Sequence, residues 1–203
     1  MRLGLIVESG PQGAEAQVLP HLAKRIMPQV EICSPTTFRN KPDMIANCGK
    51  AVANLLNVEG CNKVLIVWDL YPAWRDDGCR PDCVKDCNDI RESLQSAGIP
   101  DGDSRVSLIC IREELEAWLI ADNRALEAYL STDAHPVKGI CRKKRPDCMR
   151  NPKKELTRIF QQHGKGRYND LIHAIGIVKW LPDLNRITRS QSFQRFCEKL
   201  QKG

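Results

Sequence analysis

Short apolar runs alternate with helical segments through the first 130 residues, and this alternation restricts the fold more than any other feature of the sequence. Each run has the length and composition of a strand that is buried on both faces. The predicted strands cover residues 3–7, 30–33, 63–68 and 106–111. The predicted helices cover residues 14–27, 44–56, 81–97 and 113–130. Strands and helices in this order form a mostly parallel sheet with right-handed crossovers and helices on both faces, so we predict an α/β fold.

The last third of the chain has a different pattern and the opposite charge. Residues 138–203 carry 17 Lys and Arg against 5 Asp and Glu, a net +12, whereas residues 1–137 carry 14 against 20, a net −6. Three helices with no strand between them are predicted at residues 152–162, 168–180 and 190–200. We therefore predict an α/β domain over residues 1–137 and a basic helical extension, packed on it, over residues 138–203.

No apolar run approaches the roughly 18 residues of a membrane-spanning helix. The apolar N-terminal run is interrupted by Glu8 and is too short for the core of a signal peptide. The expected location is therefore the cytoplasm, where the 10 cysteines would be reduced.

Cys79, Cys83 and Cys87 recur every four residues, which allows either a metal or redox site on one helix face or ordinary packing.

Acidic residues follow three of the four predicted strands. Glu8 ends the first strand, Asp69 ends the third, and an acidic cluster follows the fourth. A parallel sheet brings these ends to one edge, where a divalent cation such as Mg²⁺ or Mn²⁺ relieves the repulsion between carboxylates. The predicted metal ligands are Glu8, Asp69, Glu114, Glu116 and Asp122. The helix dipole alone explains an acid at the start of the fourth helix, but it explains Glu8 and Asp69 less well.

The sequence around these acids resembles a bacterial family of unknown function that is placed among the Toprim-like proteins. The resemblance covers nearly the whole chain and is carried by Val7–Gly10, Val67–Pro72, Glu114–Asp122, Asn151–Lys154 and Ser192–Phe196. It implies a Toprim-like sheet and Mg²⁺ bound by a glutamate after the first strand, matching Glu8, and by an Asp-x-Asp motif after the third, whose first aspartate matches Asp69. The second aspartate of that motif is replaced by Tyr71, and Asp76, Asp77 or Asp82 are the nearby acids that could substitute for it.

The basic part of the chain suggests a polyanionic partner. A run of four cations, followed by further Lys and Arg residues, suits contact with phosphates, although a solvated surface loop would have the same composition. The predicted nucleic-acid contacts are Arg142, Lys143, Lys144, Arg145, Lys154 and Arg167.

Together these features predict a Toprim-like, Mg²⁺-dependent enzyme that cleaves phosphodiesters, a nuclease of the kind found in phage defence or in mobile elements. In this hypothesis Glu8 and Asp69 hold metal, Glu116 is a further ligand or a general base, and Lys153 or Lys154 binds the scissile phosphate. The alternative is a nucleic-acid-binding module whose metal site is degenerate and not catalytic. A third possibility is an effector that requires a partner subunit or a second copy of itself.

Overall fold

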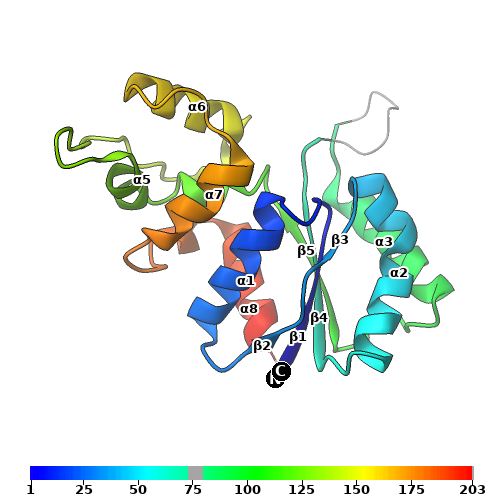
Figure 1. The fold of residues 1–203 in the computed structure, drawn as a ribbon. Coiled ribbons are helices and arrows are strands. Elements are labelled where there is room, and N and C mark those ends of the chain that lie inside the picture. Colours follow the sequence, from blue (N-terminus) through cyan, green and yellow to red (C-terminus); the bar gives the residue numbers. More distant parts are fainter. Residues whose placement is uncertain (73–79, 203) are drawn as a thin grey trace. The chain divides into compact units, whose positions relative to one another are not determined.

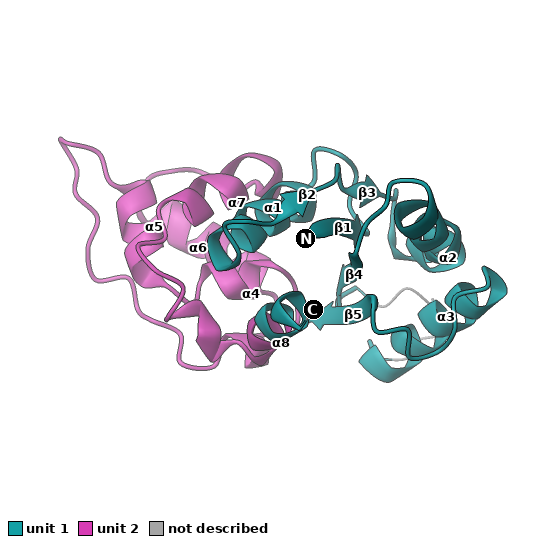
Figure 2. Ribbon diagram, turned by 90° about the horizontal axis from the view of Figure 1, so that it is seen from below, with its two compact units in different colours: residues 1–111, 196–203 teal, residues 112–195 magenta. Residues whose placement is uncertain are grey.

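The computed structural model describes residues 1–72 and 80–202. It divides into two compact units, shown in different colours in Figure 2. Unit 1 consists of Met1–Ile111 and Phe196–Gly203, and unit 2 consists of Arg112–Arg195. These boundaries differ from the change of charge at residue 137. The units are defined by contacts in the folded structure, whereas the charge boundary was defined by composition alone.

Unit 1 is built on a parallel sheet whose central strand is β1 (Arg2–Val7). Two short strands, β2 (Glu31–Ile32) and β3 (Thr36–Thr37), pair with successive parts of one edge of β1. Strand β4 (Lys63–Asp69) pairs with its other edge, and β5 (Val106–Ile111) pairs with β4. All of these pairings are parallel, and the order is β2-β1-β4-β5 with β3 beside β1 (Figure 1). The predicted α/β fold class is confirmed, and the arrangement is consistent with a Toprim-like sheet.

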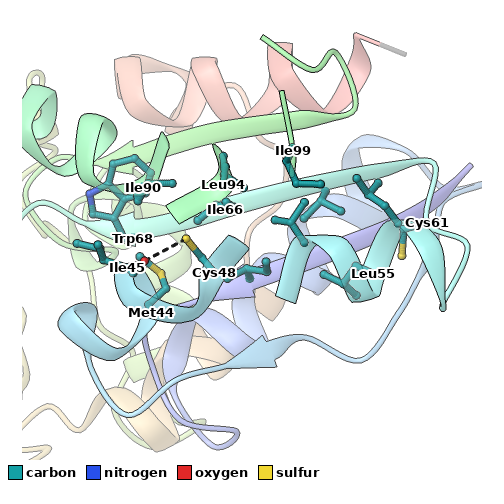
Figure 3. Packing of buried hydrophobic residues seen from close by; sticks show 14 of the residues in the cluster. Met44, Ile45, Cys48, Leu55, Cys61, Ile66, Trp68, Ile90, Leu94 and Ile99 are labelled. Atoms are coloured by element: carbon teal, nitrogen blue, oxygen red, sulfur yellow. Dashed lines mark hydrogen bonds between the residues drawn. The ribbon is translucent and has the colours of Figure 1, made fainter. Parts of the chain in front are cut away.

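Helices cover both faces of this sheet. Helix α1 (Ala14–Ile26) lies on one face, and α2 (Lys41–Asn57) and α3 (Cys83–Ser96) lie side by side on the other (Figure 1). Polar side chains fix where α2 and α3 begin: Asn40 accepts a hydrogen bond from the Asp43 N–H, and Asp82 accepts one from the Val84 N–H. The core between the sheet and this helix pair is shown in Figure 3, where Met44 and Leu55 from α2, Ile66 and Trp68 from β4, and Ile90 and Leu94 from α3 pack together.

Helices α2 and α3 approach closely at Gly49. The Gly49 N–H donates to the Ser93 hydroxyl over 3.2 Å, and a Cβ atom at Gly49 would lie 2.1 Å from the Ser93 carbonyl oxygen.

Gly49→Ala is therefore expected to lower the free energy of unfolding by about 1–3 kcal/mol, because the clash outweighs the gain in helix propensity. Chemical denaturation measures this loss. Gly10→Ala is the control, since a Cβ atom there meets nothing within 4 Å among the described residues, and an equal loss in both variants would contradict the interpretation.

Unit 2 is helical. It contains the short helix α4 (Glu116–Leu119), α5 (Asn123–Leu130), the 3-10 turn η1 (Pro146–Cys148), α6 (Pro152–Gln162), α7 (Asp170–Lys179), the 3-10 turn η2 (Ile187–Arg189) and the start of α8 (Gln191–Gln201). The single helix predicted for residues 113–130 was wrong: the chain leaves the helical conformation at Asp122 (φ −115°, ψ 97°), which caps α5 through the Arg124 N–H. Trp118 is fully buried, where it packs edge-on against Phe193 and its indole N–H donates to the Ser192 hydroxyl over 2.8 Å.

Within the described residues no helix has both the length and the apolar composition needed to cross a bilayer.

Candidate functional site

The order in which the strands are added to the sheet of unit 1 reverses between β1 and β4. After β1 the chain pairs first on one side of that strand, as β2 and β3, and then returns to the other side as β4. In open parallel sheets, ligands bind outside the strand ends at such a switch point. Glu8 follows β1 directly, and Asp69 is the last residue of β4, so both predicted carboxylates of unit 1 lie at this position.

Glu8 and Asp69 are in direct contact. The Oε1 atom of Glu8 accepts a hydrogen bond from the Asp69 N–H over 3.2 Å. The other oxygen, Oε2, is shielded from solvent and has no hydrogen-bond partner within the described residues, and the same is true of the Ser9 hydroxyl. Asp69 is itself buried, with 7% of its surface exposed. A shielded carboxylate oxygen without a donor is the kind of group that a cation stabilises, since leaving it unpaired is costly.

Burial has the largest effect on the ionisation of Glu8. Burial raises the pKa of the Glu8 carboxyl from 4.5 to about 7. The neighbouring charges act in both directions: Lys41 lowers this pKa, Glu15 raises it, the hydrogen bond from Asp69 lowers it, and Asp86 raises it. At neutral pH the carboxyl is therefore divided between its protonated and charged forms, and a bound cation would favour the charged form.

A buried lysine lies beside these carboxylates. Lys41, the first residue of α2, donates to the carbonyl oxygens of Leu70 (3.0 Å) and Pro72 (2.9 Å), in the segment that follows Asp69. Its ammonium group lies 3.6 Å from Asp86, which also accepts a hydrogen bond of 2.9 Å from the Trp68 indole. Lys41 therefore ties the start of α2 to the end of β4 and to the first turn of α3.

The carboxylates that the structure describes do not form a complete metal site. Among residues 1–72 and 80–202, no three His, Cys, Asp or Glu side chains are grouped so that they could hold one metal ion. Two of the acids considered as substitutes for the missing aspartate, Asp76 and Asp77, lie outside the described residues. The third, Asp82, caps α3. Unit 1 therefore offers the pair Glu8 and Asp69.

The other predicted catalytic residues lie in unit 2 around Lys153. The Lys153 N–H donates to Glu114 Oε2 over 3.4 Å, and its ammonium group forms an ion pair of 2.5 Å with Asp170. Burial lowers the pKa of Lys153, but the contact with Asp170 and the charges of Glu116 and Glu114 outweigh it, so the pKa is raised overall. Burial also raises the pKa of Glu114. Lys153 is therefore cationic, but its ammonium group is already paired with Asp170.

Asp122, the last predicted metal ligand, is fully buried and binds arginine. Arg124 contacts both of its carboxylate oxygens, at 2.6 Å for the shortest pair, and Arg186 reaches it at 3.5 Å. A carboxylate that accepts several charged donors has little capacity left for a cation, so we do not include Asp122 in the metal site that we propose. Its role in the structure is to cap α5 and bind these two side chains.

The predicted nucleic-acid contacts lie in unit 2. Arg142, Lys144 and Arg145 are exposed in the segment before α6. Lys143 instead pairs with Glu155 over 2.8 Å. Lys154 and Arg167 line one hollow of about 630 Å³ beside α6, together with Glu114 and Lys153. Four residues that were predicted separately from the sequence are thus brought together at this hollow.

The predicted cysteine pattern does not form a metal site within the described residues. Cys79 lies outside the described residues, and Cys83 and Cys87 lie on the first turns of α3. A hydrogen bond with Cys83, together with burial, raises the pKa of the Cys87 thiol. A thiol with a raised pKa is a poor nucleophile at neutral pH.

Comparison with known proteins assigns the chain to a family. Residues 12–201 match the family model described as "Domain of unknown function (DUF4276)". The chain belongs to the DUF4276 family. No curated protein and no solved structure matches it. The description of DUF4276 names no activity, so the function of this member has to be inferred from its own residues.

Two charged residues of this DUF4276 protein were missed by the sequence interpretation. Lys41 and Asp86 are 5% and 4% exposed, although nothing in their local sequence marks them as buried. Lys41 follows a helix cap and precedes a proline, which is typical of a solvated first helical turn. Only their pairing across two helices, next to the carboxylates, shows that they belong to the candidate site.

Proposed function

We propose that this DUF4276 protein is a Mg²⁺-dependent, Toprim-like enzyme that cleaves phosphodiester bonds in nucleic acid, with a role in phage defence or in a mobile element. The observation that carries the proposal is the shielded Oε2 atom of Glu8, which lacks a donor within the described residues while its carboxylate contacts Asp69 at the switch point of a parallel sheet. Carboxylate oxygens are the ligands that Mg²⁺ and Mn²⁺ prefer.

The residues have separate roles in this proposal. Glu8 and Asp69 supply oxygen ligands, and Lys41 holds the segment after Asp69 through Leu70 and Pro72. A divalent ion, if bound here, would polarise a phosphoryl oxygen and lower the pKa of a bound water. In unit 2, Lys153 binds a substrate phosphate in exchange for Asp170. Glu116 keeps only the role of a general base in this proposal, since the described residues include no group of three possible metal ligands to which it could belong.

A specific observation favours a second candidate, a nucleic-acid-binding module without catalysis. Tyr71 replaces the second aspartate of the Toprim pattern, and no group of three possible metal ligands is present in the described part of the chain. With two carboxylates, a cation would be held weakly or would serve only the structure.

Cleavage assays distinguish the two candidates. The full chain is incubated with labelled single- and double-stranded DNA and RNA in Mg²⁺, Mn²⁺ or EDTA. We expect cleavage in Mg²⁺ or Mn²⁺ that is lost in EDTA, in Glu8→Gln and in Asp69→Asn, and kept in Glu92→Gln, which removes an exposed carboxylate from α3. Binding by the wild type with no cleavage in any cation would favour the binding module. Cleavage that survives both site substitutions would show that the metal site has been assigned wrongly.

A further inference from the structure

Two adjoining hollows lie along helix α6 in unit 2. One has a volume of about 630 Å³ and the other about 480 Å³. Four residues line both of them: Asn151, Lys154, Thr157 and Gln161. Asn151 is the residue that precedes α6, and the spacing of three or four residues places Lys154, Thr157 and Gln161 on one face of the helix. The face of α6 is therefore the wall that the two hollows share, and together the hollows follow the length of the helix, roughly 16 Å for its 11 residues.

The lining of this pair of hollows is strongly basic. Six Lys and Arg residues line it against two acids, a formal net charge of +4; they are Lys143, Arg150, Lys153, Lys154, Arg158 and Arg167, opposed by Glu114 and Glu155. Glu155 is engaged by Arg158 at 2.7 Å and by Lys143 at 2.8 Å, contacts that hold its pKa at about 2. It therefore remains charged and neutralises part of the lining.

Three cations of the lining are available for a ligand. The side chains of Arg150, Lys154 and Arg167 form no ion pair or hydrogen bond with any residue that the structure describes, and all three residues are exposed. Arg150 lines one hollow, Arg167 lines the other, and Lys154 lines both. Cations placed in this sequence along a groove suit a ligand with phosphates at regular intervals, rather than one isolated anion.

From this geometry we infer that the groove along α6 binds a single-stranded segment of nucleic acid, with Arg150, Lys154 and Arg167 on successive phosphates and Asn151 and Gln161 facing the bases. This inference deepens the proposed function, on which it rests, by naming the form of the substrate. Amide side chains inside hollows can read the edges of bases that have left a stack. A helix that enters the major groove of a duplex has to protrude, whereas α6 contributes the wall that these two hollows share.

Binding in EDTA tests the inference separately from catalysis. Fluorescence anisotropy is measured for the full chain with labelled 12-nucleotide single strands of DNA and RNA and with the corresponding 12-base-pair duplexes. We expect tighter binding to one or both single strands than to their duplexes. The log–log salt slope should be near −2, because each of three phosphate contacts on a single strand contributes about −0.7.

Charge reversal locates the groove. Lys154→Glu/Arg167→Glu is expected to weaken binding at least tenfold and to flatten the salt slope, since two of the three phosphate contacts are lost. Lys179→Glu, an exposed lysine at the end of α7 in the same unit, is the matched control and should change affinity less than twofold. Circular dichroism checks that all variants are folded, and Lys154→Ala/Arg167→Ala, which removes the charges without reversing them, should show a smaller loss in the same direction.

Several results would overturn the inference: equal or tighter binding to duplexes, no binding to any strand, unchanged affinity in both double variants, or an equal loss in the Lys179→Glu control. The proposed function can fail independently. If the wild type binds single strands through Lys154 and Arg167 but cleaves nothing in Mg²⁺ or Mn²⁺, the groove stands and the enzyme hypothesis falls. If the wild type cleaves and the double variants bind and cleave as it does, the enzyme stands and the groove falls.

Discussion

Replacing Lys41 by Met is expected to lower the free energy of unfolding by about 3–5 kcal/mol. Methionine fills a similar volume but has no charge, so Asp86 would remain buried without its cation and the carbonyls of Leu70 and Pro72 would lose their donor. A loss of this size is a large fraction of the 5–15 kcal/mol that typically stabilises a domain. Denaturant unfolding followed by circular dichroism measures it.

The loss should depend on pH. Burial raises the pKa of Asp86, and Lys41 and the Trp68 indole oppose that rise. Without Lys41 the pKa rises further, so the native variant keeps a proton on Asp86 that the unfolded chain releases, and stability falls as pH increases through that range. The destabilisation by Lys41→Met should therefore be smaller at pH 5 than at pH 8.

A second buried lysine provides the matched control. Lys63 is 4% exposed but forms no ion pair within the described residues, and burial, together with the charges of Lys199 and Lys202, lowers its pKa. Lys63→Met should change stability by less than about 1 kcal/mol or increase it, because it removes repulsion instead of a partner. Equal losses in the two variants would show that removing any buried lysine destabilises the protein to this extent. The pairing of Lys41 with Asp86 would then make no specific contribution to stability.

The sequence was informative wherever one local pattern determined the outcome. Glu8 and Asp69 were predicted to meet because each ends an apolar run, and a parallel sheet brings such ends together whatever the loops between them do. Lys41 could not be found in this way, because its burial depends on the packing of α2 against the segment after β4, 29 and 31 residues further along the chain.

Unit 2 shows the same limit. Residues 113–130 have helical periodicity throughout, yet Asp122 interrupts the helix because its side chain caps α5 and binds Arg124 and Arg186. Lys153 was predicted to bind a phosphate, but the sequence did not indicate that Asp170, 17 residues later, pairs with it. Periodicity reports which face of a segment is apolar. It does not report which distant charge will be placed opposite a given side chain.

Glu8→Gln is expected to stabilise the metal-free protein at pH 8. Burial raises the pKa of Glu8 to about 7, so the native state keeps a proton that the unfolded chain releases near pH 4.5. Between these values the native state binds more protons than the unfolded state, and stability therefore falls as pH rises through this window. The difference between these two pKa values corresponds to a loss of roughly 3 kcal/mol above pH 7. Glutamine keeps the acceptor for the Asp69 N–H and removes this loss.

Thermal unfolding in EDTA from pH 5 to pH 8 measures the effect. The melting temperature of the wild type should fall relative to that of Glu8→Gln across this range, whereas Glu92→Gln, which alters an exposed side chain, should follow the wild type. Addition of Mg²⁺ at pH 8 should raise the melting temperature of the wild type and of Glu92→Gln but not that of Glu8→Gln, because binding to the native state alone stabilises it. Parallel pH profiles for the wild type and Glu8→Gln would show that Glu8 is charged without cost in the native protein, and the main argument for a cation at the switch point would then be lost.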